Sequence, residues 1–277
     1  MKESLISNEE IKEFLPVFNS KHGDLFIKWA KKLTKLDDAC EMYDGSKHLS
    51  GVTFITDLLD KLELERIVEN VEVLEQFKDK PFITVSNHPN GHVDGMALIE
   101  TVASRTDNFK VMVNFILGLV DTMEENFIKV SPYTHTDKMQ HISLSGIKEC
   151  IKQLRSGYPL GFFPAGSVSR LKMHNGKFVI FDREWQPSVM KIIRKANVPV
   201  IPIHIDCRNR YSFYITRFIY WKLQTLVLCH ELKNKKGKKM VITVGDPIMP
   251  ETIKQYEEAD ELADFLREKT YALAKKR

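Results

Sequence analysis

Residues 82–95 read FITVSNHPNGHVDG, and this stretch decides how we expect the chain to fold. Its first five residues have the apolar character of a buried strand, and the residues from Asp94 onward have the apolar spacing of a helix. A polar loop therefore joins the end of a strand to the start of a helix. Because open α/β sheets bind their ligands at the carboxyl ends of strands, the same stretch predicts where a site lies.

Outward from this stretch, the chain changes character near residue 66. Residues 1–65 read as helical, and strands alternate with helices from there onward, without repeats or a long linker. This alternation predicts an α/β fold with a mixed, mostly parallel central sheet flanked by helices. We expect a helical N-terminal cap at 1–65 and an α/β domain at 66–277, together forming one compact unit. The expected strands are 67–74, 82–86, 109–114, 127–130, 160–163, 198–207 and 241–244, and the expected helices 94–104, 141–155, 185–195 and 251–274.

The composition is that of a globular protein with an uneven distribution of positive charge. The 277 residues are 43% hydrophobic and 28% charged, with a net charge of +4 and lysine clusters at 233–239 and 275–277. Such clusters contact anionic lipid, an acidic carrier protein or nucleic acid, or are simply solvated. The four cysteines are widely spaced, which predicts reduced thiols in a cytosolic protein. The N-terminus is too charged for a signal peptide, and no window reaches the ~18 apolar residues of a spanning helix.

His88 and Asp94 are the loop residues that we expect to carry chemistry. A neutral histidine is the side chain best suited to accept a proton near pH 7. A nearby carboxylate holds the other ring nitrogen, which fixes the tautomer and stabilises the imidazolium. Gly91 and Gly95 give the loop the backbone freedom that lets the two side chains meet. Two structural roles compete with this hypothesis: Asp94 as a helix cap, and His88 as a hydrogen-bonded histidine at a strand end.

The same loop also has an interpretation as a metal site. His88, His92 and Asp94 are possible Zn²⁺ ligands, with His204 or His174 completing the set. Against this, Asn90 stands where metallo-β-lactamase-like hydrolases have a further histidine, and no cysteine lies nearby. We therefore expect no metal.

Three motifs in register give the chain a resemblance to a known family. They are Asn87-His88 to Asp94, Phe163 to Ser169, and the strand at 198–203, which reads VPVIPI. They resemble the first, third and fourth motifs of the glycerolipid acyltransferase superfamily, the PlsC-like enzymes that acylate lysophospholipids, over roughly residues 65–250. The pattern NHPxGxxDG followed by FPAGxVS is similar to a hemolysin-like bacterial branch that includes O-acyltransferases of amino-acid-containing lipids. The resemblance implies a glycerol-3-phosphate acyltransferase-like fold.

The sequence departs from the main family in ways that this branch shares. Five residues rather than four separate His88 from Asp94, so the loop must bulge by one residue to keep their contact. Ala165 replaces the usual glutamate of the third motif, Val168 replaces its phosphate-binding arginine, and the second motif, at 127–130, lacks its arginine too. Valine cannot replace the bidentate guanidinium fork. We therefore expect the acceptor to be a lyso-aminolipid rather than lysophosphatidic acid.

The resemblance also implies a role for each matched residue. His88 removes the proton of the acceptor hydroxyl, Asp94 orients His88, and the oxygen attacks the thioester of acyl carrier protein or coenzyme A. This acyl thioester is a co-substrate, and no cofactor or metal is implied. Backbone N–H groups near Gly166 are candidate donors to the oxyanion. The implied substrate-binding residues are Asn87, Pro164, Ala165, Gly166, Ser167, Ser169 and Arg170, with Lys129 as a possible compensating charge.

The expected partners are a lyso-lipid acceptor, an acyl carrier protein or acyl-coenzyme A, and a membrane surface. Residues 211–232 mix aromatic, basic and aliphatic side chains, which favours a helix in the membrane interface over a purely internal helix. We expect a cytoplasmic protein that associates peripherally with the inner face of the cytoplasmic membrane. No nucleotide-binding motif is present, and nucleic-acid binding would rest on the lysine run alone.

Three alternative functions remain open from the sequence. A lipid thioesterase or hydrolase would use the same histidine with water as the nucleophile. A metal-dependent hydrolase would use His88, His92 and Asp94 as ligands. A non-catalytic lipid-binding protein would show no turnover at all.

Overall fold

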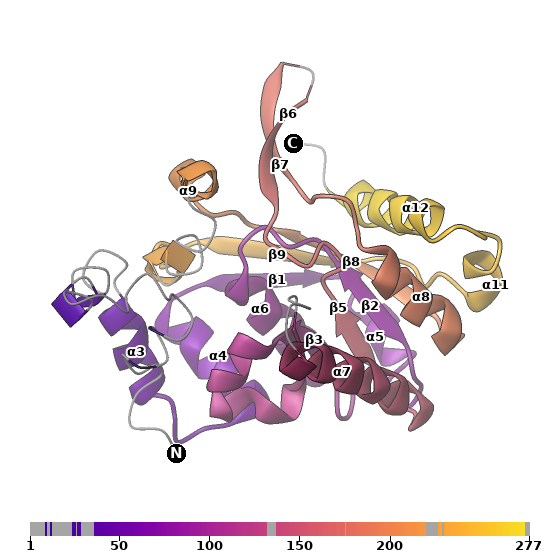
Figure 1. Cartoon of the computed structure of the whole chain (residues 1–277), viewed down its shortest axis with the longest axis horizontal. Coiled ribbons are helices and arrows are strands. Elements are labelled where there is room, and N and C mark those ends of the chain that lie inside the picture. Colours follow the sequence, from indigo (N-terminus) through magenta and orange to yellow (C-terminus); the bar gives the residue numbers. More distant parts are fainter. Residues whose placement is uncertain are drawn as a thin grey trace.

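A computed structural model describes residues 36–131, 137–174, 176–219, 227–228 and 230–274, together with isolated residues at 9, 12, 24–25 and 27–28. Its centre is a seven-stranded sheet in the order β1-β9-β8-β2-β5-β3-β4 (Figure 1). Every neighbouring pair is parallel except β8 and β9. The prediction of a mixed, mostly parallel sheet is therefore confirmed. The strands are β1 (Glu65–Glu69), β2 (Ile83–Ser86), β3 (Lys110–Asn114), β4 (Phe127–Val130), β5 (Leu160–Phe162), β8 (Val200–Asp206) and β9 (Lys239–Val244).

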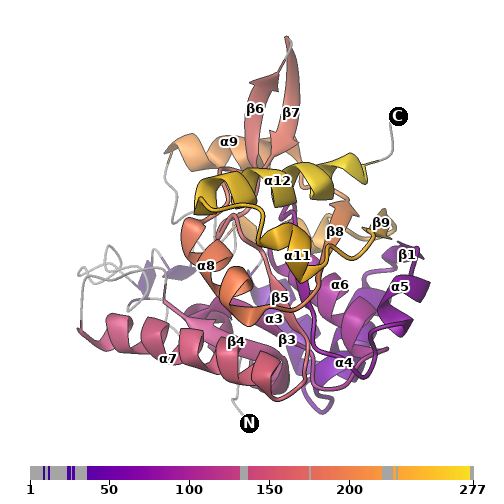
Figure 2. The same ribbon diagram turned by 90° about the vertical axis from the view of Figure 1, so that its right-hand side faces the viewer.

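Helices cover both faces of the sheet and give the molecule three layers (Figures 1 and 2). Apolar residues of α3, α4 and α6 share one core cluster with alternate residues of β8 and β9. Those of α7, α8 and α12 form the second cluster with β2 and β5 on the opposite face. The helices are α3 (Leu36–Asp44), α4 (Gly51–Lys61), α5 (Glu72–Glu75), α6 (His92–Ala103), α7 (Asp137–Arg155), α8 (Pro187–Ala196), α9 (Tyr211–Ile219), α11 (Pro250–Ile253) and α12 (Ala259–Ala272), with 3-10 turns η2 (Phe115–Leu119) and η3 (Asp121–Asn126).

Part of the expected N-terminal cap is described. Its helices α3 and α4 contribute side chains to the same core cluster as the sheet, while most of residues 1–35 lie outside the described residues. Within the described part of the chain, no helix combines the length and the hydropathy that crossing a membrane requires.

The structure differs from the sequence predictions in three elements. The strand expected at 67–74 ends at β1, because Asn70 adopts a positive φ of 56°, and α5 follows. The helix expected at 251–274 is two helices, α11 and α12, separated by an extended Glu258. A hairpin of β6 (Arg170–His174) and β7 (Lys177–Phe181), which the sequence analysis did not anticipate, forms a separate two-stranded sheet.

The topology brings three loops of the chain to one place. β5, β2 and β8 are neighbours in the sheet and run in the same direction. The loops that follow their carboxyl ends, at 163–169, 87–91 and 207–210, therefore meet at one edge. This is where parallel sheets bind ligands.

Candidate active site

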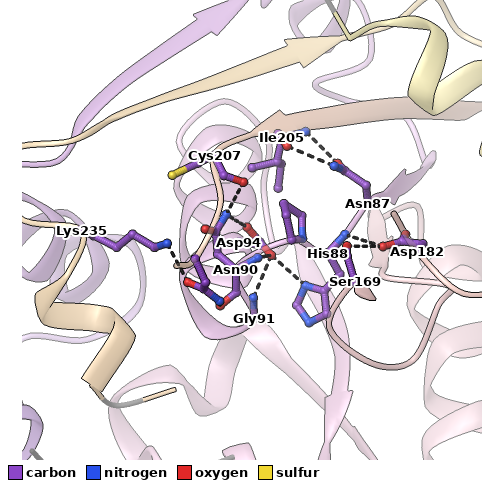
Figure 3. A network of polar contacts seen from close by, with 12 residues as sticks. Asn87, His88, Asn90, Gly91, Asp94, Ser169, Asp182, Ile205, Cys207 and Lys235 are labelled. Carbon is purple, nitrogen blue, oxygen red and sulfur yellow. Dashed lines mark hydrogen bonds and ion pairs between the residues drawn. The ribbon is translucent and has the colours of Figure 1, made fainter. Parts of the chain in front are cut away.

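His88 and Asp94 meet as the sequence predicts. Nδ1 of His88 lies 3.1 Å from Oδ2 of Asp94 (Figure 3), although the approach is not aligned well enough to count as a hydrogen bond. The His88 side chain is 18% exposed and the Asp94 side chain is fully buried. The ring stacks on Phe163 at 4.2 Å, which fixes its plane. Because Nδ1 faces the carboxylate, Nε2 is on the side away from Asp94.

Asp94 contacts the backbone of the loop as well as the His88 side chain. Its Oδ2 accepts hydrogen bonds from the backbone N–H groups of Asn90 (2.7 Å) and Gly91 (2.9 Å), and its Oδ1 accepts from the Asn90 side chain (2.7 Å). Asp94 lies in the first turn of α6, where a carboxylate satisfies free N–H groups and the helix dipole. Capping and orienting His88 are therefore compatible roles of one side chain. The expected bulge occurs at Gly91, whose φ of 83° and ψ of −125° few other residues adopt.

Asn87 fixes the position of the loop on the sheet. Its side-chain N–H donates to the carbonyl of Ile205 (3.0 Å), and its side-chain oxygen accepts from the Ile205 N–H (2.7 Å). The residue is 3% exposed. Both amide groups of Asn87, which we expected to contact substrate, are thus occupied by β8.

A second buried carboxylate, Asp182, joins the loops that follow β2 and β5. Its Oδ1 accepts hydrogen bonds from the Ser169 hydroxyl (2.5 Å) and the backbone N–H of His88 (3.3 Å), and its Oδ2 accepts from the Trp185 indole (2.9 Å). Burial raises the pKa of Asp182 above its usual value, and these donors act against that rise. The backbone N–H of Ser169 in turn donates to the His88 carbonyl at 2.8 Å. Ser169, expected to contact substrate, therefore faces the protein interior.

The turn at 164–167 is held from behind by the segment that precedes α8. The carbonyl of Pro164 accepts from the Gln186 N–H (2.9 Å), and that of Ala165 accepts from the Arg183 side chain (2.6 Å). The N–H of Gly166 donates to the Phe163 carbonyl (2.9 Å), so this amide is occupied by the turn itself. None of these contacts involves the outer face of the turn.

Ser167 and Arg170 keep polar atoms without partners. The Ser167 hydroxyl oxygen and the Arg170 Nε are buried and have no hydrogen-bond partner within the described residues. Arg183, which the sequence analysis missed, lies close enough to Arg170 for charge repulsion to add to desolvation in lowering its pKa. In the described part of the chain, neither arginine forms an ion pair with a carboxylate. Two cations therefore lie close to the 165–167 turn, and the charge of Glu184 partly offsets their effect on the pKa of Arg183.

A chain of side chains connects the loop to a buried lysine. Asn209 donates to the Asn90 carbonyl (3.2 Å), and Asn90 donates to the Cys207 carbonyl (3.1 Å). The Lys235 ammonium donates to Asn209 Oδ1 (2.6 Å) and to the Arg208 carbonyl (2.8 Å), and Lys235 is 0% exposed (Figure 3). Burial lowers the pKa of Lys235, while the nearby charges that include Asp94 oppose the shift. The lysine therefore steadies the loop that holds Asp94.

Lys129 does not join the site. It lies on β4, three strand positions from β2 and thus about 14 Å across the sheet. Its ammonium pairs with Glu124 at 2.9 Å. The substrate-binding role expected of Lys129 is therefore corrected. Val168, in contrast, lies against the loop that holds His88, because a Cβ added to Gly91 would approach its Cγ2 to 3.2 Å.

The described residues give no support to the metal interpretation. Among them, no group of three or more His, Cys, Asp or Glu side chains is arranged to hold a metal ion. Desolvation, with the charge of Lys235 next, lowers the pKa of His92 to about 4. His204 is buried beneath the Tyr271 ring, with centroids 5.7 Å apart. The side chain of His174 lies outside the described residues.

The chain is similar to proteins of known activity over most of its length. Two relatives cover 89% of this chain: the lyso-glycine lipid O-acyltransferases of Bacteroides thetaiotaomicron (26% identical, 89% of its length) and Phocaeicola vulgatus (24% identical, 87% of its length). Among solved structures, the 1-acyl-sn-glycerophosphate acyltransferase PlsC of Thermotoga maritima matches with a TM-score of 0.46 and 15% identity over 96% of each chain. The resemblance that the motifs indicate is confirmed by a family model described as acyltransferase, which matches residues 11–276. The chain therefore belongs to this acyltransferase family.

Proposed function

We propose that this protein transfers a fatty acyl group from the thioester of acyl carrier protein or coenzyme A to the hydroxyl of a lyso-lipid, working at a membrane surface. The observation that carries the proposal is the contact of His88 Nδ1 with the buried Asp94 carboxylate at the carboxyl edge of the sheet. In the tautomer that carries its proton on Nδ1, the nitrogen facing the carboxylate, Nε2 has a free lone pair and can accept a proton. General-base catalysis of this kind contributes roughly 100- to 10,000-fold in rate.

The chemical step follows from this arrangement. Nε2 of His88 takes the proton of the acceptor hydroxyl while its oxygen bonds to the thioester carbonyl carbon. The carbon–sulfur bond then breaks, and the imidazolium returns the proton to the leaving thiolate. The oxyanion formed between these events needs hydrogen-bond donors. Since the Gly166 N–H is occupied, the candidates are the backbone N–H groups of Ser167 and Val168, which donate to no acceptor within the described residues.

The test is acyl transfer by the purified protein with labelled acyl carrier protein or acyl-coenzyme A and a lyso-lipid. We expect His88→Ala to lower kcat by at least about 100-fold without changing the melting temperature. His141→Ala, which removes an exposed histidine from α7, is the matched control and should be fully active. Free fatty acid released without acylated lipid would identify a hydrolase and contradict the transferase. Unchanged transfer by His88→Ala would remove this residue from the mechanism.

The acceptor is a lyso-aminolipid with a free carboxylate. The named activity of the relatives supports this class, because a glycine that is linked through its nitrogen keeps its carboxylate. Arg170 and Arg183 lie close to the 165–167 turn, neither forms a salt bridge with a carboxylate in the described residues, and they supply charge where Val168 cannot. Arginine recognises a carboxylate through two parallel hydrogen bonds.

Arg183→Ala should therefore raise the KM for a lyso-glycine lipid by roughly 10- to 100-fold, the value of one or two charged hydrogen bonds. The KM for a lyso-lipid with an uncharged headgroup, and the KM for the acyl donor, should stay constant. Lys129→Ala serves as the control because it removes a cation that lies outside the site. An effect of Arg183→Ala on the donor KM alone would assign the arginine pair to the donor. Preference of the wild-type protein for lysophosphatidic acid would refute the aminolipid assignment.

A further inference from the structure

The β6–β7 hairpin is an arm that stands away from the body of the molecule. Figures 1 and 2, drawn at right angles, both show the two strands projecting past the layers of helices and sheet. The arm is a two-stranded sheet of its own, and an isolated hairpin in water is only marginally stable. Its base is secured by Phe181, whose ring stacks on Tyr271 of α12 at 3.9 Å. The tip has no comparable cover among the described residues.

One face of the arm is apolar along its whole length, whereas the other mixes cations with Val179 and Phe181. The register pairs Leu171 with Ile180 and Met173 with Phe178. Because side chains alternate along a strand, these four apolar residues share one face. Met173 is 68% exposed and Phe178 is 62% exposed, so the largest apolar groups of this face are open to solvent at the far end of the arm. A contiguous exposed apolar surface of this kind marks an interaction site rather than a random surface residue.

Helix α9 lies beside the arm and exposes apolar side chains of its own. It contacts β6, and it exposes Tyr211 (43%) and Ile215 (50%), which lie one helical turn apart on the same side. Arg208 lies over the Tyr211 ring, 4.8 Å from its centroid, and donates to the Tyr211 hydroxyl at 2.6 Å. Tyrosine with an adjacent basic side chain is typical of the headgroup depth of a bilayer.

The charges of both segments have one sign. Residues 170–181 contain three cations (Arg170, Lys172 and Lys177) and no acid, and residues 208–219 contain three arginines and no acid. The whole chain is nearly balanced, with 41 Lys and Arg against 37 Asp and Glu. Exposed apolar side chains in segments that contain cations and no acid fit an anionic lipid surface, to which each cation adds attraction.

The arm is rooted in the catalytic loops. β6 begins next to Ser169, whose N–H donates to the His88 carbonyl, and β7 ends next to Asp182, which accepts from the Ser169 hydroxyl. The Tyr214 hydroxyl of α9 donates to the Pro89 carbonyl at 2.7 Å. Both parts of the surface therefore connect directly to the loop that holds His88. A bilayer bound there would present its lipids next to the proposed site.

We propose that the arm and the exposed face of α9 form the membrane-docking surface, with Met173, Phe178, Tyr211 and Ile215 entering the headgroup region of an anionic bilayer. This inference rests on the proposed lipid acyltransferase function and specifies which surface meets the lipid. It accounts for access to a membrane-bound acceptor by a chain whose described helices do not span a membrane.

The first test is flotation of the purified full-length protein with vesicles of phosphatidylglycerol and phosphatidylcholine. Replacing Met173 and Phe178 together by serine should lower the partition coefficient about 10- to 100-fold, because two apolar side chains no longer leave water. Leu144→Ser removes an equally exposed apolar residue (58%) from α7 and should leave partitioning unchanged. Lys172→Gln with Lys177→Gln should weaken binding to anionic vesicles by about fivefold per charge and leave binding to pure phosphatidylcholine unaltered. Equal partitioning of wild type and the serine double variant would overturn the inference.

A second readout separates this inference from the proposed function. The serine double variant should acylate a short-chain lyso-lipid that is monomeric in solution at the wild-type rate, and should lose activity only on acceptor embedded in vesicles. If the wild type acylates neither form, the proposed function fails, whereas vesicle binding still reports on the surface. A double variant that keeps vesicle binding but shows a raised KM for acyl carrier protein would assign the surface to the carrier and overturn the membrane proposal.

A third variant keeps the arm apolar and so does not depend on the folding of the serine variant. Phe178→Trp should report the insertion directly, through quenching of the added fluorescence by bilayers that contain brominated acyl chains. The wild-type protein in the same vesicles supplies the background from the three native tryptophans. Absence of additional quenching would contradict insertion of the arm.

Discussion

At the scale of single residues, the loop at 87–91 depends on a backbone conformation that only glycine adopts without strain. Gly91 has a φ of 83°, and a Cβ at this position would lie 2.8 Å from Leu228 Cδ2 and 3.2 Å from Val168 Cγ2. The Gly91 N–H is also one of the donors that hold the Asp94 carboxylate. Strain at this residue therefore acts directly on the contact between Asp94 and His88.

We predict that Gly91→Ala lowers the free energy of unfolding by about 1–3 kcal/mol and lowers kcat at least about tenfold, because the loop must shift. Chemical denaturation and steady-state kinetics measure the two effects. Gly157→Ala is the matched control, since Gly157 also has a positive φ (88°) but has no atom within 4 Å of an added Cβ. It should lose stability and keep its kcat. A wild-type kcat in the Gly91→Ala variant would show that the bulge is dispensable.

The contact between His88 and Asp94 could be predicted from the sequence, because the two residues are six positions apart on one turn and local geometry alone brings them together. Gly91 could be assigned for the same reason. Asp182 and Lys235 could not be predicted, since their contacts with the site join residues far apart in the chain: His88 and Asp182 are separated by 94 positions. An aspartate after a strand, or a lysine within a lysine-rich run, carries no local signal of such a role. Burial distinguishes them, and burial is a property of the fold.

At the scale of elements, the site depends on the segment at 230–238, which supplies Lys235 from outside the three loops. Lys235 lies among exposed lysines, but its ammonium is enclosed by the Arg208 carbonyl and Asn209 Oδ1. Asn209 in turn holds the Asn90 carbonyl. Two consecutive hydrogen bonds therefore connect this segment to Asn90 and help to fix the position of the loop at 87–91.

We predict that Lys235→Met lowers the free energy of unfolding by about 1–3 kcal/mol, because two buried oxygen acceptors lose their donor. Its effect on kcat should exceed its effect on KM, because the fully buried Lys235 is out of reach of the lipid that accepts the acyl group. Lys235→Arg should not restore the rate, because a larger cation does not fit the enclosed position. Lys236→Met is the neighbouring control. Lys236 is exposed and pairs with the exposed Glu63, so the change should be within about 0.5 kcal/mol. A purely raised KM in Lys235→Met would contradict the positioning role.

Elements of the central layer were predictable, and the arm was not. β2, β4 and β5 have runs of apolar residues that no turn interrupts, and their predicted bounds agree with the structure within about one residue. The first strand of the arm alternates basic and apolar residues, and an Asn-Gly pair follows it at 175–176, which is a hairpin signal. Its consequence, an apolar face open to solvent, depends on the register.

At the scale of the whole molecule, the sequence indicates the class of fold but not the order of its strands. Alternating strands and helices predict a mostly parallel sheet, and the structure confirms it. β8 follows β5 in the chain, yet it lies on the other side of β2, and β9 pairs with it in the opposite direction. This order is set by the burial of both sheet faces at once. It also decides that the loops after β2, β5 and β8, rather than any other three, form the site.

The pH dependence of the free energy of unfolding should reflect the ionisation of His92. Its pKa is lowered from 6.5 to about 4 in the folded protein, so the unfolded chain takes up a proton on this residue first as the pH falls. The stabilisation is therefore complete above pH 6.5 and is lost progressively between pH 6.5 and about 4. A pKa shift of this size corresponds to at most about 3 kcal/mol of unfolding free energy. The partial exposure of His92 reduces this value, because solvent screens the charge.

We predict that His92→Gln, which cannot titrate, removes this share of the acid sensitivity. The difference in unfolding free energy between wild type and variant, measured by urea denaturation at intervals from pH 7.5 to 4, should shrink or change sign toward low pH by about 1–3 kcal/mol. His141→Gln on the exposed side of α7 should follow the wild-type curve. Because carboxylates that titrate near pH 4 are common to all three proteins, they cancel in the difference. A difference that is independent of pH would mean that His92 is protonated equally in both states, and that Lys235 and the surrounding protein do not disfavour its charge.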